Sequence, residues 1–164
     1  GGRYTYKQGV LSMEHNFEKL KEHILPLSNA TDFHHAKNEW KLVGVEINED
    51  WDNCPCGQSI KELCYIENQI NNQKTYVGNV CINKFIGIDT GNLFAGLKRI
   101  AKDDSANANE DLIIHAYKLG YIFEKEYSFL MDTKNKRKLS EKQLAWKQKI
   151  NNRITNQTVV RAKS

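Results

Sequence analysis

The sequence predicts an α+β protein, a mostly helical single domain that contains a β-hairpin. Apolar residues recur at helical spacing through most of the chain, which favours helices. Residues 42–47 are rich in β-branched side chains, and Asn71-Asn72 forms a turn sequence between two extended segments, so strands are expected there. The 164 residues are 40% hydrophobic and 27% charged, a balance that excludes disordered and collagen-like chains. No apolar run approaches the ~20 residues of a membrane span.

The N-terminal part should begin with two helices. The first runs from Ser12 and should end at Pro26, with an apolar face made of Phe17, Leu20 and Ile24. A second, shorter helix is expected from about Asp32, just before the strand at 42–47. Residues 1–11 are interpreted as a tag or an extended N-terminus, because the chain opens with Gly-Gly and has no initiating Met.

A β-hairpin is expected between residues 63 and 77. Residues 63–69 and 74–77 are typical of strands, and Asn71-Asn72 suits the two-residue turn that would join them. With the turn centred on these asparagines, Ile66 should oppose Val77 and Cys64 should oppose Asn79. A helix should open within residues 80–85, directly after the second strand.

The C-terminal half should be helical, with apolar stripes at 93–101, from Asn107 to Gly120, at 123–131 and from Ser140. Asn107 and Glu110 have the form of a capping box, and Gly120 suits a C-terminal glycine cap. The last helix has the clearest start, because Ser140 pairs with Gln143 in a second capping box.

All four cysteines lie in one segment, at Cys54, Cys56, Cys64 and Cys81. We expect a cytosolic chain, and in such a chain clustered cysteines favour a metal over disulfides. Four thiolates would complete a tetrahedral Zn²⁺ shell, and a closed shell should hold the fold together rather than catalyse. Buried unligated thiols, a redox pair and an iron–sulfur cluster are the alternatives.

The cysteine segment orders its predicted elements as a knuckle at Cys54-Pro-Cys-Gly57, a hairpin and a helix. This order resembles a treble-clef zinc finger. We therefore expect one domain over residues 12–155, with a zinc-finger core at 40–90 and a helical part at 92–155. A flexible basic tail should follow at 156–164.

Charge is distributed unevenly along the chain. Residues 133–164 carry ten basic side chains against one acid, a net of +9, whereas residues 1–132 carry a net of −5. Such a basic segment favours a polyanionic partner, although a solvated helix or a tail docked on the acidic body would show the same pattern. The candidate nucleic-acid-binding residues are Lys134, Lys136, Arg137, Lys138, Lys142, Lys149 and Arg153.

Several short motifs resemble a family of small four-cysteine zinc-finger proteins of bacteria and phages. The most specific is Val77-Gly-Asn-Val-Cys-Ile-Asn-Lys-Phe85, and the others are Glu39-Trp40, Cys-Pro-Cys-Gly, Cys64-Tyr-Ile-Glu-Asn and Leu139-Ser-Glu-Lys-Gln143. The resemblance covers roughly residues 36–155. It implies the four cysteines as Zn²⁺ ligands and a cytoplasmic location, bacterial or in the host of a phage. It implies no substrate.

Catalytic residues are scarce in the sequence, so the protein is expected not to be an enzyme. His34 and His35 are the strongest candidates for a general base, but adjacent residues on a helix point about 100° apart. No phosphate-binding glycine loop or metalloprotease helix occurs in the sequence. No small-molecule substrate is evident.

Two binding functions follow from these observations. The first is a zinc-stabilised protein that binds DNA or RNA through its basic C-terminal helix and its finger. In that function Tyr65 and Tyr76 could stack on bases beside Lys61, Lys74 and Lys84, and the alternative is that both rings pack on the domain body. The alternative is a protein-interaction module, such as a phage-encoded inhibitor of a host defence or nucleic-acid machine, that uses its acidic N-terminal part.

Overall fold

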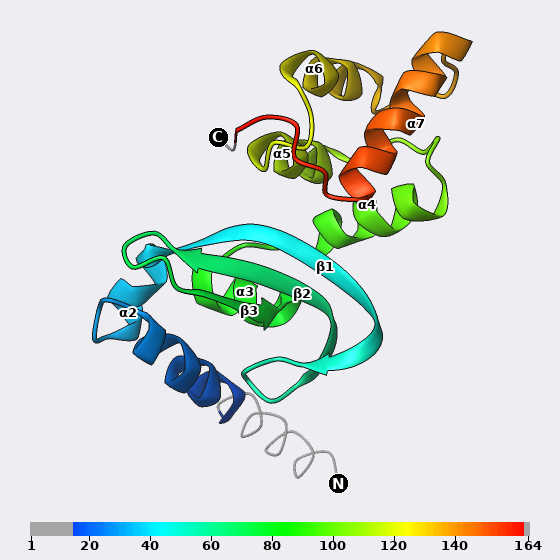
Figure 1. Ribbon diagram of the computed structural model, residues 1–164. Helices are drawn as coiled ribbons and strands as arrows, with labels where there is room; N and C mark the ends of the chain where they lie inside the picture. The colour runs from blue at the N-terminus through cyan, green and yellow to red at the C-terminus, as the bar shows by residue number, and fades with distance from the viewer. Residues whose placement is uncertain (1–14, 163–164) are drawn as a thin grey trace, which may run out of the picture. The chain divides into compact units, whose positions relative to one another are not determined.

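The computed structural model describes residues 15–162, and the chain divides into two compact units (Figure 1). Unit 1 is Gly1–Asp89 and unit 2 is Thr90–Ser164. The sequence predicted one domain over residues 12–155, and the division falls between its expected finger core and its helical part. The expected tag at 1–11 and the start of the first helix lie outside the described residues.

Unit 1 joins a three-stranded antiparallel sheet, in the order β1-β2-β3, to short helices. The described chain opens in a helix at residues 15–24, and Pro26 lies in the 3-10 helix that follows. The elements are η1 (Leu25–Leu27), α2 (Phe33–Ala36), η2 (Lys37–Glu39), β1 (Trp40–Asn53), β2 (Ser59–Asn68), β3 (Lys74–Gly78) and α3 (Asn79–Ile86). Helix α3 packs against β2 and β3, as Figure 1 shows, and carries one of the cysteines on its first turn.

The hairpin register differs from the predicted one by two residues. Cys64 opposes Val77, and Ile66 opposes Thr75. The connection is longer than two residues, because the amide of Asn68 donates to the carbonyl oxygen of Gln73 at 2.8 Å. The fully buried Asn68 side chain also accepts from the amide of Ile70 at 2.9 Å, so the turn is built around that side chain.

Aromatic packing closes the core of unit 1. The ring of Phe85, on α3, stacks on Phe33 with 5.1 Å between centroids and lies 6.5 Å from the ring of Trp40. Phe85 is 1% exposed, and Leu20 and Ile24 of the N-terminal helix are fully buried. Leu20 and Ile24, which belong to the apolar face predicted for that helix, are therefore part of the core.

The described residues of unit 2 form four helices: α4 (Gly91–Lys102), α5 (Glu110–Lys118), α6 (Glu124–Thr133) and α7 (Glu141–Thr155). The capping box predicted for α7 is confirmed, since Ser140 Oγ accepts from the amide of Gln143 and Gln143 Oε1 accepts from the amide of Ser140. The capping box predicted for Asn107 and Glu110 is wrong. The N-cap of α5 is Asn109, whose side chain accepts from the amide of Leu112, whereas Asn107 Nδ2 donates to the carbonyl oxygen of Lys136.

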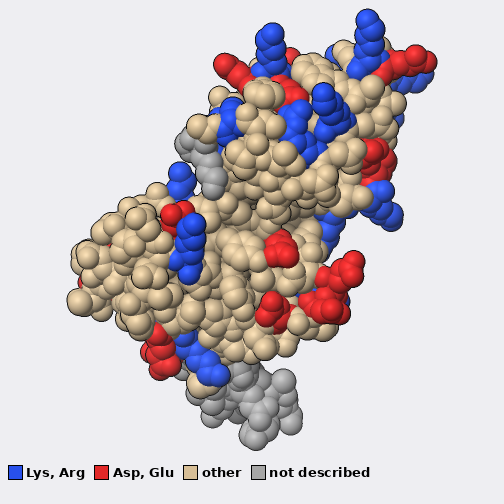
Figure 2. Space-filling model, in the orientation of Figure 1, with Lys and Arg blue, Asp and Glu red and all other residues tan. Residues whose placement is uncertain are grey.

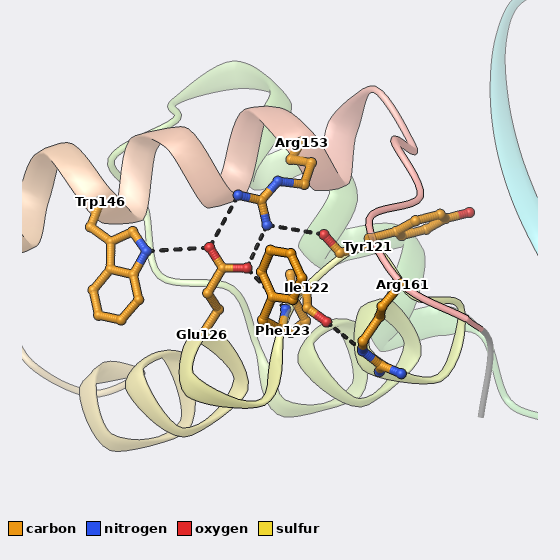
Figure 3. A network of polar contacts seen from close by, with 7 residues as sticks. All are labelled: Tyr121, Ile122, Phe123, Glu126, Trp146, Arg153 and Arg161. Atoms are coloured by element: carbon orange, nitrogen blue, oxygen red, sulfur yellow. Dashed lines mark hydrogen bonds and ion pairs between the residues drawn. The ribbon is translucent and has the colours of Figure 1, made fainter.

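The C-terminal segment, predicted to be a flexible tail, lies against unit 2 as far as it is described. The amide of Val160 donates to the carbonyl oxygen of Gly120 at 2.8 Å, and Arg161 Nε donates to that of Ile122 at 2.7 Å (Figure 3). Gly120 has a φ of +81°, and a Cβ there would collide with the carbonyl oxygen of Arg161. The segment can dock because glycine leaves this space.

Candidate metal centre and cationic cleft

A tight turn presents the first two thiols. The amide of Gly57 donates to the carbonyl oxygen of Cys54, and the amide of Cys54 donates to that of Gln58, each at 2.8 Å. Gly57 has a φ of +99°, a conformation that favours glycine. The sequence Cys-Pro-Cys-Gly therefore folds locally into a tight turn, which we call the knuckle.

Three thiols meet where the knuckle approaches α3. The sulfur atoms of Cys54, Cys56 and Cys81 all lie within 4.8 Å of one another, and all three residues are buried. Sulfur ligands around a tetrahedral Zn²⁺ stand about 3.8 Å apart, given Zn–S bonds of about 2.3 Å. The Cys54 and Cys81 sulfur atoms are 3.5 Å apart, so the group could hold a metal ion.

Hydrogen bonds favour the thiolate form at Cys54. Cys54 Sγ shares a hydrogen bond with Cys81 Sγ and accepts another from the amide of Gly78 at 3.2 Å. The Cys81 hydrogen bond is the largest cause that lowers the pKa of Cys54 to about 6, and the same bond together with burial raises the pKa of Cys81. Burial also raises the pKa of Cys56. Metal binding would therefore release protons from Cys56 and Cys81.

Cys64, the fourth predicted ligand, lies outside this group. It sits in the middle of β2, between Val45 and Val77 on the neighbouring strands, and is fully buried. No cysteine forms a disulfide. Within residues 15–162, the thiol group therefore has three members, where the sequence predicted a closed set of four.

A second candidate site is a cleft of about 950 Å³ in unit 2. We call it the cationic cleft, because one acid, Asp103, lines it together with six basic residues: Arg99, Lys102, Lys134, Lys136, Arg137 and Lys138. Figure 2 shows Lys and Arg side chains spread over the helices of this unit. Lys134 Nζ lies 3.2 Å from the carboxylate of Glu110, which neutralises it. The other five cations still make the cleft strongly positive.

Side chains of α7 hold the floor of the cationic cleft, the loop of residues 103–107. Asn151 Nδ2 donates to the carbonyl oxygens of Asp104 and Ala106, at 2.8 Å each. Asn107 Nδ2 then donates to the carbonyl oxygen of Lys136 at 2.9 Å. The loop between α6 and α7 is thereby tied to the floor, and its cations line the same cleft as those of α4.

The seven predicted nucleic-acid-binding residues separate into three groups. Lys134, Lys136, Arg137 and Lys138 line the cationic cleft. Lys142 and Lys149 are exposed on α7 and do not line it. The sequence reasoning missed Arg99 and Lys102, although their three-residue spacing on the polar face of α4 was a signal for a shared surface.

Arg153, the seventh, is committed to the fold. Its guanidinium forms two hydrogen bonds to the carboxylate of Glu126, which also accepts from Trp146 Nε1 at 3.2 Å (Figure 3). Burial opposes ionisation of Glu126, but the bonds from Arg153 and from the amide of Phe123 outweigh it and lower the pKa of Glu126. An arginine neutralised in this way cannot also serve a phosphate.

The finger tyrosines face acidic partners. Tyr65 donates its hydroxyl to Glu46, and this bond raises the pKa of Tyr65 to about 12. Tyr76 donates to the carbonyl oxygen of Asn53 at 2.8 Å, close to Asp52. The acids beside both rings disfavour an approaching phosphate.

No protein-family model, curated protein or solved structure matches this chain. The resemblance to four-cysteine zinc fingers of bacteria and phages therefore stays a prediction. Among the described helices, none combines the length and the apolar character that crossing a membrane requires.

Proposed function

We propose that unit 2 binds nucleic acid in its cationic cleft. The observation that carries this proposal is the convergence of six cations and one acid on a single concave surface. Unit 2 has 15 basic and 8 acidic side chains, a net of +7, whereas unit 1 has 9 and 12, a net of −3. Each cation that neutralises a phosphate releases a condensed counterion, which would drive the association.

The lining chemistry favours the sugar–phosphate backbone over the bases as the group recognised. None of the described residues that line the cleft is aromatic, so it offers no platform on which bases could stack. Asn107, Asn135 and Ser105 add hydrogen-bonding groups of the kind that contact phosphate oxygens. Binding should therefore be independent of sequence and should weaken steeply with salt.

The experiment is a fluorescence anisotropy titration of the full chain against a 20-base-pair DNA duplex at low and moderate salt. The double variant R137E/K138E should bind at least about tenfold more weakly than the wild type. K118E/K125E makes the same charge change on exposed residues outside the cleft and is the matched control. Equal losses in the two variants, or no binding by the wild type at low salt, would reject the proposal.

We propose Zn²⁺ as the ion of the thiol group. Three buried thiols and the short Cys54–Cys81 sulfur distance support it, because soft thiolates select Zn²⁺ over Mg²⁺ or Ca²⁺. The ion would tie the knuckle to α3 and stabilise unit 1, without a catalytic role. Cys64 was predicted as its fourth ligand, and a metal count on Cys64→Ser tests that assignment.

A protein-interaction module is the second candidate, and an exposed tryptophan favours it. Trp51 is 68% exposed where β1 bulges, since Ile47 and Asp52 pair with Glu62 and Ile60 of β2. Glu49 and Asp50, also exposed, precede it, so the acidic part of the chain presents an aromatic anchor. Capture of a host protein that Trp51→Ala abolishes, together with no duplex binding, would favour this function.

A further inference from the structure

Helix α7 carries a lysine, Lys147, whose side chain is fully buried. Its Nζ donates to Asn107 Oδ1 and to the carbonyl oxygen of Thr133 at 3.4 Å. Both acceptors are neutral, and no carboxylate of the described residues lies within ion-pair distance. Burial accordingly lowers the pKa of Lys147. A buried ammonium without a counter-charge is costly, so its presence in a packed helix face requires an explanation.

This ammonium lies directly behind the lining of the cationic cleft. Asn107, its first acceptor, lines the cleft and donates through Nδ2 to the carbonyl oxygen of Lys136. Thr133, its second acceptor, immediately precedes the lining residue Lys134. Lys147 therefore sits where the floor loop meets the α6–α7 loop, and a single side chain, Asn107, joins it to the cleft surface.

We propose that the cationic cleft holds a phosphate group at Asn107, and that Lys147 is the buried positive charge that this phosphate neutralises. The proposal rests on the proposed function and names the group recognised: a phosphate oxyanion, from a nucleic-acid backbone or from free phosphate. Lys147 acts as a positioning residue. Its hydrogen bond to Asn107 fixes the side-chain amide that donates to the carbonyl oxygen of Lys136. Its charge attracts the anion across buried protein, where solvent screens charges only weakly.

Further cations surround the cleft. Arg99, Lys102 and Lys136 line the cleft, so Lys147 adds its charge to a group of like charges. A neutral side chain could fill the same space, and replacing a buried unpaired charge by an apolar group of similar volume is often neutral or stabilising. A bound anion reduces the repulsion among all these cations, which explains why position 147 carries a charged residue.

The first experiment is calorimetric binding of inorganic pyrophosphate to the full chain at constant ionic strength. Lys147→Met keeps the length of the side chain and removes the charge, and it should weaken binding by about tenfold. Lys149→Met makes the same charge change two residues further on, at an exposed position outside the cleft, and should change binding less than about twofold. Equal effects of the two variants, or no pyrophosphate binding by the wild type, would overturn the proposal.

A second variant covers the case in which Lys147→Met does not fold. Asn107→Asp places a carboxylate within reach of the Lys147 ammonium, so the chain supplies its own counter-charge. Circular dichroism should show a folded protein that has lost pyrophosphate binding. Folded Asn107→Asp that binds pyrophosphate as the wild type does would contradict a phosphate seat at this residue.

Repeating the titrations with the DNA duplex separates the two sources of phosphate and the two proposals. Duplex binding that falls in both R137E/K138E and Lys147→Met supports a backbone phosphate at Asn107. Duplex binding that falls only in R137E/K138E keeps the proposed function and rejects the role of Lys147. Lys147-dependent binding of pyrophosphate without any duplex binding rejects the nucleic-acid function and assigns the seat to free phosphate.

Discussion

The two units bring their functional side chains together in different ways. In unit 1, net −3, neighbouring residues of a knuckle bring Cys54 and Cys56 to the first turn of α3. In unit 2, net +7, residues far apart in sequence meet through side-chain bonds from α7 to the floor loop. The thiol cluster needs a short turn that meets the first turn of α3, whereas a cleft that gathers like charges needs a rigid polar clamp behind it.

The largest expected effect separates the units by their need for metal. We expect about one zinc per chain, and Cys54→Ser or chelation should unfold unit 1, because the binding free energy of a structural zinc, about 10 kcal/mol or more, is folding free energy. Unit 2 should keep its helices. Elemental analysis and amide NMR spectra measure both outcomes.

Cys64→Ser is the control within the same sheet. If Cys64 stays outside the metal shell, this variant keeps its zinc and loses only about 1–3 kcal/mol, the cost of burying a hydroxyl beside apolar neighbours. Loss of the metal would instead make Cys64 a ligand. A folded, metal-free wild-type protein would show that unit 1 needs no metal to fold.

The next effect concerns the buried ion pair of unit 2. The side chains of Glu126 and Arg153 are 6% and 13% exposed, so Arg153→Met should cost about 3–5 kcal/mol by leaving an uncompensated buried charge. Chemical denaturation followed by fluorescence measures it, with Lys149→Met as the exposed control. A loss below about 1 kcal/mol would show that the pair is dispensable.

The same pair predicts a pH dependence. Because the pKa of Glu126 is lower in the folded state than its ordinary 4.5, the unfolded chain binds this proton more readily. The stabilisation is thus present above pH 4.5 and is lost as the pH falls through the folded pKa. In Arg153→Met this contribution should shrink, because burial raises the carboxyl pKa and only the bonds from the amide of Phe123 and from Trp146 Nε1 remain to oppose it.

The smallest effect tests the docked C-terminal segment. Gly120→Ala combines a strained φ of +81° with a collision against Arg161, and should cost about 1–3 kcal/mol and free the segment to exchange its amides. Gly87→Ala has a similar φ of +72° but open space around its Cβ, so it isolates the backbone cost of about 1 kcal/mol. Equal effects would show that Arg161 adjusts freely.

Helix α7 shows where prediction from sequence fails. The spacing of Trp146, Ile150 and Ile154 predicts an apolar stripe on this helix, yet its buried residues also include Lys147 and Asn151. From the sequence, polar residues at these positions are expected to face solvent, because a hydropathy pattern carries no information about hydrogen-bond acceptors on other elements. The helix itself was predicted well, since its capping box involves residues only three positions apart.

The sequence by itself determined what depends on neighbouring residues: the α+β class, the hairpin, the start of α7, the knuckle thiols and the unequal charge of the two ends. These follow from turn, capping and periodicity rules that act over a few residues. Only the tertiary structure decided that Cys64 stays in mid-strand, that Arg153 neutralises Glu126 and that Arg99 and Lys102 join Lys136 in one cleft. The reason is that these outcomes depend on which buried partner each polar side chain meets across the fold.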